Sequence, residues 1–365
     1  MAELSRARVT THDVARAASV SRVTVSRVLN DHDNVTADVR ERVLQAAADL
    51  GYLGRRSRPS AGAGPGAARG PLLREIGFLF TSVVGEEPVS GNAFWSRVLH
   101  GVEQEATAGG AHVTYRSISL WADRPDLLIE AVRSARLDGI LLVGPALEST
   151  ARTLLRTGRP LVLVDNAIPG VAADAVLADG FTGARAAVAH LLEHGHRDIA
   201  FIGGPFRAGP PPLAHPTNTV WSVEQRAVGY WTALREAGVE PDPGLYEGDN
   251  LTTAGGYAAC RRLLEGGRRF TAIFCANDES AIGATRALHE ARLAVPDDVS
   301  LVGFDDIEVA AHLIPPLTTV RVDKMAIGAC GVQRLAARAL APGAPTSTTK
   351  LHVDLVPRGT VAPAR

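Results

Sequence analysis

The sequence predicts two parts of different fold class: a small all-α head and a larger α/β body built on parallel sheets. The length of 365 residues is enough for two or three domains. Residues 55–71 are rich in Gly, Pro, Ala and Arg and lack apolar periodicity, which is typical of a linker. After this linker, short apolar runs alternate with amphipathic segments, a pattern typical of repeated βαβ units.

The charge is divided between the head and the body. Residues 1–74 hold 12 arginines and 7 acidic residues, a net charge of +5, whereas the remainder carries −6. The near-neutral total of −1 is therefore a sum over two unlike parts. A basic head on an acidic body predicts a polyanionic partner for the head. Of the 38 basic residues, only Lys324 and Lys350 are lysines.

The six apolar runs of the body are the expected strands, and the pattern restarts after Asp179. The runs lie at residues 75–81, 139–143, 160–165, 198–203, 271–275 and 299–304. Amphipathic segments such as 94–108 and 183–194 lie between them, so we expect helices on both faces of each sheet. The restart predicts two similar halves with a ligand between them. Ligands in such folds lie beyond the carboxyl ends of the strands.

The head is expected to fold as three short helices. Thr10 and Asp13 resemble a capping box, residues 18–20 form a tight turn, and Ser21 is a favourable N-cap for a second helix. The third helix is expected to start at Thr36. Its expected buried residues are Val39, Val43, Leu44, Ala47 and Leu50. Two short helices joined by about four residues form a helix-turn-helix, whose second helix enters the DNA major groove. A helical docking domain with surface arginines is the alternative.

Several motifs resemble the lactose/galactose-repressor (LacI/GalR) family of bacterial transcription regulators. The first is D-V-A-x-x-A-x-V-S-x-x-T-V-S-R-V-L-N at residues 13–30. Further similarity lies at residues 92–95, 190–205, 226–229, 277–278, 302–306 and 315–319. The resemblance implies a dimeric, effector-controlled operator binder whose body has a two-lobed periplasmic-binding-protein-like fold.

The resemblance also assigns DNA-contacting roles in the head. Arg22 and Val23 match the base-reading positions at the start of the recognition helix, and Arg27 matches a general DNA-contacting arginine. The capping or phosphate-contacting positions are Thr10, Ser21, Thr24, Ser26, Asn30 and Thr36. Arg55 and Arg56 in the linker are candidates for further phosphate or minor-groove contacts.

Two features depart from the family pattern. Ser19 stands in the turn where Gly is usual, which predicts a mildly strained turn. The family's short hinge helix carries a Leu that wedges into the minor groove, but residues 58–62 of this chain read RPSAG. Pro59 disfavours a helix interior and Ala61 is too small to act as a wedge, so the hinge is atypical.

The resemblance places effector-binding residues at loops near the strand ends. They are Asn92, Phe94, Trp95, Asp165, Arg226, Leu251, Asn277 and Asp305. Carboxylates and an arginine bind vicinal hydroxyls, and aromatic faces stack on sugar rings, so this chemistry suits a sugar or related polyol. Asn166 and Leu251 replace expected arginine and aromatic residues, which favours a ligand smaller or less hydroxylated than a hexose.

Simpler interpretations remain for some of these residues. Phe94 and Trp95 could be core residues at a helix start, Arg226 could be ion-paired at the surface, and Asp305 could be a turn residue. Residues 206–225 form a proline-rich loop beside the expected cleft. Its Trp221 or Asn218 could reach the ligand, or the loop could be a tolerated insertion.

Catalysis, metals and cofactors find no support in the sequence. It has no G-x-S-x-G, H-E-x-x-H or P-loop motif, its 11 histidines form no metal-ligand pattern, and residues 203–205 lack G-x-G-x-x-G spacing. Cys260, Cys275 and Cys330 form an odd, widely spaced set, which favours a reducing compartment. With no apolar run near the 18 residues of a membrane span, we expect a cytoplasmic, nucleoid-associated protein without cofactors.

The expected organisation follows from these motifs. Residues 1–54 form the helix-turn-helix domain and 55–73 the atypical hinge. The N-terminal lobe of the body comprises 74–178 and 323–349, and the C-terminal lobe 179–322 and 350–365. We expect a sequence-specific DNA-binding regulator, by family default a repressor, that binds a palindromic operator as a homodimer and is controlled by a small molecule.

Two other functions fit parts of the sequence. A sugar-binding transport component is disfavoured by the head and by the lack of an export signal. The remaining alternative is the same DNA binder without a small-molecule effector, either constitutive or controlled by a protein partner. No leucine heptads follow the last expected strand, so no tetramerising tail is expected.

Overall fold

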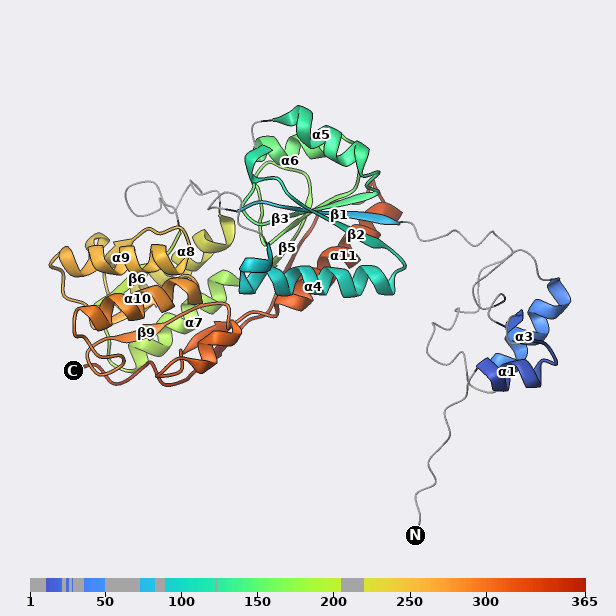
Figure 1. Ribbon diagram of the computed structural model, residues 1–365. Coiled ribbons are helices and arrows are strands. Elements are labelled where there is room, and N and C mark those ends of the chain that lie inside the picture. The colour runs from blue at the N-terminus through green and yellow to red at the C-terminus, as the bar shows by residue number, and fades with distance from the viewer. Residues whose placement is uncertain are drawn as a thin grey trace, which may run out of the picture. The chain divides into compact units, whose positions relative to one another are not determined.

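The computed structural model describes residues 11–21, 24–25, 28, 36–49, 73–82, 89–121, 124–204 and 220–365 (Figure 1). The chain forms two compact units, residues 1–68 and 69–365, which are described separately. Among the described residues, no helix is long and apolar enough to cross a membrane.

The head contains helices α1 (Thr11–Ala17) and α3 (Ala37–Asp49), with a helical segment at residues 24–25 and 28 between them. Ser19 in the turn after α1 has a left-handed backbone (φ 53°), the conformation that glycine adopts without strain. The Ser21 Oγ accepts a hydrogen bond from the Thr24 backbone N–H at 3.1 Å, as an N-cap does. Val14, Val25, Val28, Val43 and Ala47 form the apolar core of this unit.

One core assignment in the head is wrong. Leu44 is 41% exposed, while Ala46 is buried, because Val43, Ala46 and Ala47 share the inner stripe of α3 and Leu44 lies beside it. Several predicted DNA-contacting positions lie outside the described residues. They are Thr10, Arg22, Val23, Ser26, Arg27, Asn30, Arg55 and Arg56.

The first lobe of the body is a six-stranded parallel sheet of order β11-β5-β4-β3-β1-β2. Its strands are β1 (Glu75–Phe80), β2 (His112–Ser117), β3 (Gly139–Val143), β4 (Leu161–Val164), β5 (Asp174–Ala178) and β11 (Thr348–Leu351). Helices α4 (Ala93–Ala108) and α11 (Lys324–Leu340) cover one face, and α5 (Pro125–Ser134) and α6 (Glu148–Leu155) cover the other.

The central strands of this sheet are buried on both faces, which explains their uninterrupted apolar sequences. On β3, Leu141 and Val143 contact the α4–α11 side, whereas Ile140 and Leu142 contact the α5–α6 side. This alternation is the two-residue period of a strand. The edge strand β2 is more polar and exposed, so its sequence did not predict a strand.

The second lobe is a four-stranded parallel sheet of order β7-β6-β8-β9. Its strands are β6 (Ile199–Ile202), β7 (Tyr246–Glu247), β8 (Ala272–Cys275) and β9 (Ser300–Val302). Helices α7 (Gly180–Glu193) and α8 (Trp221–Glu236) pack on one face, and α9 (Thr253–Glu265) and α10 (Asp278–Glu290) on the other. Because α8 begins at Trp221, the expected loop over 206–225 is wrong in its last five residues.

The chain passes three times between the lobes. The first passage joins β5 to α7, the second joins β10 (Thr319–Arg321) to α11, and the third joins β11 to β12 (Asp354–Val356). Strands β10 and β12 pair antiparallel beside these passages. Strand β11 keeps pairing with β5 as far as Leu351, so the third passage follows Leu351 rather than residue 349. Short 3-10 turns lie at Val89–Gly91, Ser119–Trp121, Pro243–Leu245 and Glu308–His312.

Helices α4 and α11 approach each other closely because each helix has a glycine at the point where the two helices cross. A Cβ placed on Gly101 would lie 2.2 Å from the Met325 carbonyl oxygen, and one on Gly328 would lie 2.2 Å from that of Val98. Side chains cannot occupy that space, so the two backbones are in direct contact. The two helices therefore form one packed pair beneath the first sheet (Figure 1).

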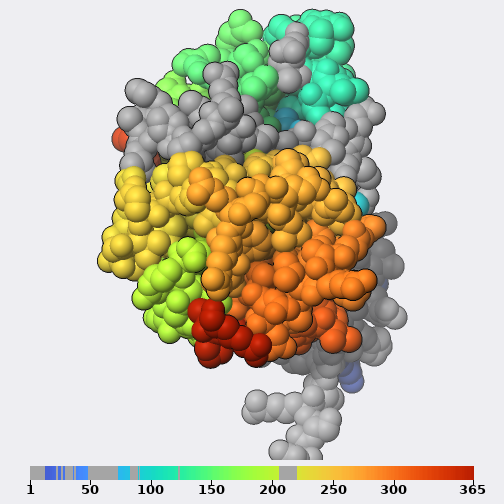
Figure 2. Space-filling view, turned by 90° about the vertical axis from the view of Figure 1, so that its left-hand side faces the viewer, coloured from blue at the N-terminus to red at the C-terminus, as the bar shows by residue number. Residues whose placement is uncertain are grey.

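The C-terminal residues lie on the surface of the second lobe (Figure 2). The Thr360 carbonyl accepts from the Leu301 N–H at 2.8 Å, and the Ala364 N–H donates to the His194 carbonyl at 2.8 Å. His196 is buried and bridges Thr271 and the Ala362 carbonyl through its two ring nitrogens. His196 therefore links the C-terminal residues to the residue that precedes β8.

Candidate effector site between the lobes

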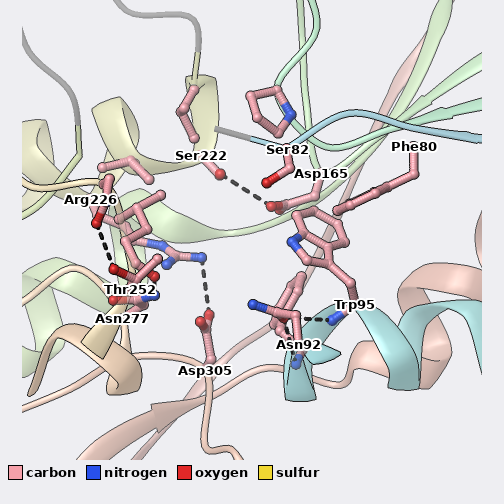
Figure 3. A pocket seen from close by; sticks show the side chains of 16 residues that line it. Phe80, Ser82, Asn92, Trp95, Asp165, Ser222, Arg226, Thr252, Asn277 and Asp305 are labelled. Atoms are coloured by element: carbon pink, nitrogen blue, oxygen red, sulfur yellow. Dashed lines mark hydrogen bonds and ion pairs between the residues drawn. The ribbon is translucent and has the colours of Figure 1, made fainter. Parts of the chain in front are cut away.

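A pocket lies between the two lobes, at the carboxyl ends of the strands of both sheets (Figure 3). It encloses about 740 Å³ of space, part of which is open to solvent. The first lobe lines it with Phe80, Ser82, Asn92, Phe94, Trp95, Pro145 and Asp165, and the second with Val220, Ser222, Val223, Arg226, Asn250, Leu251, Thr252, Asn277 and Asp305. Parallel strands bring their carboxyl ends to one edge of a sheet, and both edges face this pocket.

Arg226 of α8 is the buried cation of the site. Its side chain is 4% exposed, and its guanidinium lies 3.2 Å from the Asp305 carboxylate and donates to the Ala276 carbonyl at 2.5 Å. The guanidinium also stacks over the Phe304 ring, 3.9 Å from the ring centroid. A buried charge requires such partners, and the cation–π contact adds to them. Arg226 is therefore not a surface ion pair.

Asp165 connects the lobes at the pocket. It follows β4 in the first lobe, and its Oδ2 accepts a hydrogen bond from the Ser222 hydroxyl of α8 in the second lobe, at 3.2 Å. Its backbone is left-handed (φ 53°), an uncommon conformation for a residue other than glycine. Such strain persists where surrounding contacts fix the residue, and it is concentrated at functional sites.

Burial dominates the electrostatics of the two pocket carboxyls. It raises the pKa of Asp165 to about 7; the Arg226 charge opposes this shift and the Asp305 charge adds to it. Burial also raises the pKa of Asp305, against the charges of Arg226 and Lys324. Perturbed carboxyls in a pocket indicate a functional site.

Two asparagines at the pocket also hold helix ends in place. Asn92 is the N-cap of α4, and its Oδ1 accepts from the backbone N–H groups of Phe94 and Trp95. Asn277 caps α10, accepting from the Ser280 N–H, and donates through its Nδ2 to the Leu251 carbonyl. Asn277 thus uses its amide oxygen and one of its two amide N–H groups within the protein. The Asn92 amide NH2 has no partner among the described residues and is free to donate to a ligand.

Aromatic rings form one wall of the pocket. Phe94 and Trp95 are perpendicular with centroids 4.8 Å apart, and Phe80 meets Trp95 edge-on at 5.5 Å. Phe94 is buried at the start of α4, so it is both a core residue and a pocket residue. Trp95 is only half-buried, and its ring extends toward the centre of the pocket (Figure 3).

Several buried polar atoms in the pocket have no hydrogen-bond partner among the described residues. They are the Oδ1 of Asp165 and the Nε of Arg226; the Oδ1 of Asp305 also lacks a hydrogen bond, but it lies 3.2 Å from the Arg226 guanidinium in an ion pair. Unpaired buried polar atoms cost free energy, so native proteins rarely retain them without a reason. One unpaired acceptor and one unpaired donor thus belong to residues that line the same pocket.

All eight predicted effector residues line this one pocket. The strand-end rule also pointed to the segment after Thr81, which supplies Ser82. Apart from Arg226, sequence reasoning missed the start of α8, where Val220, Ser222 and Val223 line the pocket and Trp221 does not. A helical period beginning at residue 221 was the available signal, but the preceding prolines concealed the helix start.

A metal site is absent from the described part of the chain. No group of three or more His, Cys, Asp or Glu there could hold a metal ion.

In the head, Ser21, Thr24 and Thr36 are the only predicted DNA-contacting residues within the described segments. Ser21 and Thr24 share a hydrogen bond of 2.8 Å between their hydroxyls.

Comparison with known proteins connects the pocket to the head. Residues 10–54 match the family described as bacterial regulatory proteins, lacI family, and residues 188–361 match the periplasmic binding protein-like domain. The ribose operon repressor of Haemophilus influenzae is 32% identical over 356 residues, which cover 96% of this chain and 98% of the relative. The chain belongs to the lacI family. This lacI-family member is a DNA-binding transcriptional repressor, not an enzyme.

Solved structures share the fold. A transcriptional regulator CelR–cellobiose complex is similar with a TM-score of 0.69 and 28% identity, covering 97% of this chain and all of that chain. A lac repressor dimer bound to operator and the anti-inducer ONPF also has a TM-score of 0.69, with 25% identity and coverage of 97% and 99%. The predicted combination of a helix-turn-helix head with a two-lobed, parallel-sheet body is therefore confirmed.

The pH dependence of stability tests the burial of Asp165. Between about pH 4 and pH 7, folded Asp165 keeps a proton that the unfolded chain has lost, so its contribution to stability falls as pH rises through this range. We expect the free energy of unfolding of Asp165→Asn to fall less steeply over that range than the wild-type value. Urea denaturation at a series of pH values measures both slopes.

The matched control is Asp198→Asn, which removes an exposed carboxylate from the same body. Its slope should equal that of the wild type. Equal slopes for Asp165→Asn and the wild type would show that Asp165 ionises normally in the folded protein.

Proposed function

We propose that this lacI-family repressor binds a two-fold symmetric DNA operator as a homodimer in the cytoplasm, and that a small sugar or related polyol in the inter-lobe pocket controls this binding. The carrying observation is that the Asp165 Oδ1 and the Arg226 Nε lack hydrogen-bond partners among the described residues, in a pocket that Asp305 and the Trp95 ring also line. A polyol supplies hydroxyls that both donate to carboxylates and accept from a guanidinium. Its apolar ring face suits an aromatic wall.

The size and polarity of the pocket support a small saccharide. Leu251 contributes an aliphatic side chain where an aromatic surface could have stacked on a second ring. Phe80 and Val223 add further apolar lining. The relatives named above support saccharides of two sizes as probes, D-ribose and cellobiose.

A ligand of the pocket is an effector only if it changes the affinity of the protein for its operator. With D-ribose or cellobiose at saturation, we expect operator affinity to change by about 5- to 150-fold, the usual range of allosteric coupling. Asp305→Asn should reduce saccharide affinity by about tenfold, because it removes a charged hydrogen-bond acceptor. Calorimetry gives the saccharide affinity, and fluorescence anisotropy of labelled operator gives the shift.

Asp297→Asn, which changes an exposed carboxylate of the same lobe, is the control and should leave both values unchanged. If operator binding is intact but no saccharide shifts it, the alternative applies: the same DNA binder without a small-molecule effector.

Selection of bound DNA from random sequence tests operator recognition. We expect an inverted repeat with half-sites about one helical turn apart. Arg22→Ala should relax base preference at one position of each half-site, because arginine pairs bidentately with guanine at a cost of about 1–3 kcal/mol per lost contact. Failure to enrich any inverted repeat would refute operator recognition by a dimer.

The control variant is Arg16→Ala in α1, whose guanidinium pairs with Asp13 at 2.6 Å and is largely exposed. It should leave the selected sequence unchanged. If Arg22→Ala weakens binding equally on all sequences, Arg22 contacts phosphate rather than a base.

An exposed apolar segment supports the dimer. Ile314 is 97% exposed and Val309 44% exposed, and both lie in the segment that follows Asp306 in the second lobe, Val309 within the 3-10 turn Glu308–His312. Exposed large apolar side chains close in sequence are typical of interaction surfaces. We expect Ile314→Glu to shift the protein toward monomers at concentrations where the wild type is a dimer, as measured by analytical ultracentrifugation.

Leu340→Glu is the matched control, since Leu340 is 74% exposed at the end of α11. It should leave the sedimentation coefficient unchanged. A dimer that survives Ile314→Glu would place the interface elsewhere.

A further inference from the structure

Lys324 is the first residue of α11 and follows the second passage of the chain between the lobes. Its half-buried ammonium donates to three backbone carbonyls: Asp305 at 2.5 Å, Asp306 at 3.1 Å and Val322 at 3.1 Å. An ammonium has three N–H donors, so all of them are used. In a chain whose other basic residues are arginines apart from Lys350, this position carries a compact point charge.

The two carbonyls from the second lobe belong to a strained segment. Asp305 and Asp306 have left-handed backbones, with φ of 107° and 51°. Such conformations cost free energy and persist only where contacts hold them. The Asp305 carbonyl also accepts from the Val322 N–H at 3.4 Å. Lys324 therefore helps to fix the backbone of the residue whose carboxylate faces Arg226 in the pocket.

Lys324 also belongs to the first lobe, because it is the first residue of α11. Asp323 caps α11 by accepting from the Ala326 N–H at 2.9 Å. One turn further on, α11 meets α4 in the close glycine contacts of Gly101 and Gly328. The first residues of α4 are pocket residues, Phe94 and Trp95 among them. A displacement of Asp305 can therefore be transmitted through the packed helices α11 and α4 to Phe94 and Trp95 on the opposite wall of the pocket.

We propose that Lys324 is the positioning residue that couples Asp305 in the pocket to the α11–α4 helix pair of the first lobe. The coupling rests on the proposed function only in that an effector in the pocket contacts Asp305. When Asp305 moves, its carbonyl moves with it, and the Lys324 ammonium carries that displacement to the start of α11. Coupling between sites requires such contiguous contacts with different energies in two states.

Hydrogen exchange on the full chain tests this coupling without any effector. The perturbation is Asp305→Asn, which removes the charge opposite Arg226 at 3.2 Å. The readout is amide exchange in peptides from residues 327–332 of α11 and 98–104 of α4. In the wild-type background we expect Asp305→Asn to change these rates by at least about threefold, as for groups in direct contact.

The same perturbation is then made in variants of Lys324. In Lys324→Met we expect the effect of Asp305→Asn on these helices to fall below about twofold, because the link has lost its charge and donors. Lys324→Arg keeps both and should retain the effect. Lys350→Met, which removes the other lysine from an exposed position on β11, is the control and should behave as wild type.

A purely structural role gives a different result. Lys324→Met would then accelerate exchange, yet Asp305→Asn would change α11 and α4 by the same factor with either residue at 324, and the proposal would be overturned. An absence of any effect of Asp305→Asn in the wild-type background would overturn it too. If Lys324→Met does not fold, Lys324→Gln, which keeps an amide donor without the charge, replaces it.

A second arm separates this proposal from the proposed function. D-ribose and cellobiose are titrated against operator complexes of the wild type and Lys324→Met. We expect the saccharide-induced shift in operator affinity to be reduced in Lys324→Met while saccharide affinity changes less than about threefold. Equal shifts in both proteins would refute the role of Lys324 and leave the effector intact, whereas no saccharide binding in either would refute the effector and leave the exchange result valid.

Discussion

The buried positive charge of Arg226 is the constraint on which the pocket depends. A guanidinium that is 4% exposed is stable only with charged, polar and aromatic partners around it. Asp305 and the Phe304 ring supply these from one chain segment, and the Ala276 carbonyl from another. The same arrangement leaves the Asp165 Oδ1 and the Arg226 Nε without hydrogen-bond partners among the described residues, which is the feature that a hydroxylated ligand would satisfy.

The fold places these groups by a simple rule. Each lobe is a parallel sheet whose carboxyl edge faces the other lobe, so the loops after β1, β3, β4, β7, β8 and β9 reach the same space. Some of these loops begin a helix, and the residues there serve twice. Asn92 and Asn277 cap α4 and α10 while lining the pocket, so a ligand that moves either residue also perturbs a helix start.

Because the chain passes three times between the lobes, a change in the relative position of the lobes also changes the geometry of the pocket. Ser222 of one lobe donates to Asp165 of the other inside the pocket. Outside it, Lys324 holds the backbone of Asp305 at the second passage. Because α4 and α11 meet through glycines, that passage is attached to a rigid helix pair rather than to a deformable side-chain layer.

The sequence by itself determined the fold class and the family. The apolar runs from β1, β3, β4, β6, β8 and β9 identified six buried strands, because strands covered on both faces need uninterrupted apolar residues; the buried strand β5 was not among them. The family resemblance predicted eight of the pocket residues, in loops near the strand ends. The polar edge strand β2, the two-residue β7 and the start of α8 escaped prediction, since exposure, shortness and preceding prolines remove the periodic signal.

Only the tertiary structure decided how these residues interact. No pattern of sequence shows that Arg226 is buried against Phe304, that Ser222 reaches Asp165 across the lobes, or that Lys324 holds the Asp305 carbonyl. These contacts join residues far apart in the chain. Their geometry depends on how the two sheets and their helices pack, whereas local sequence patterns report only on neighbours along the backbone.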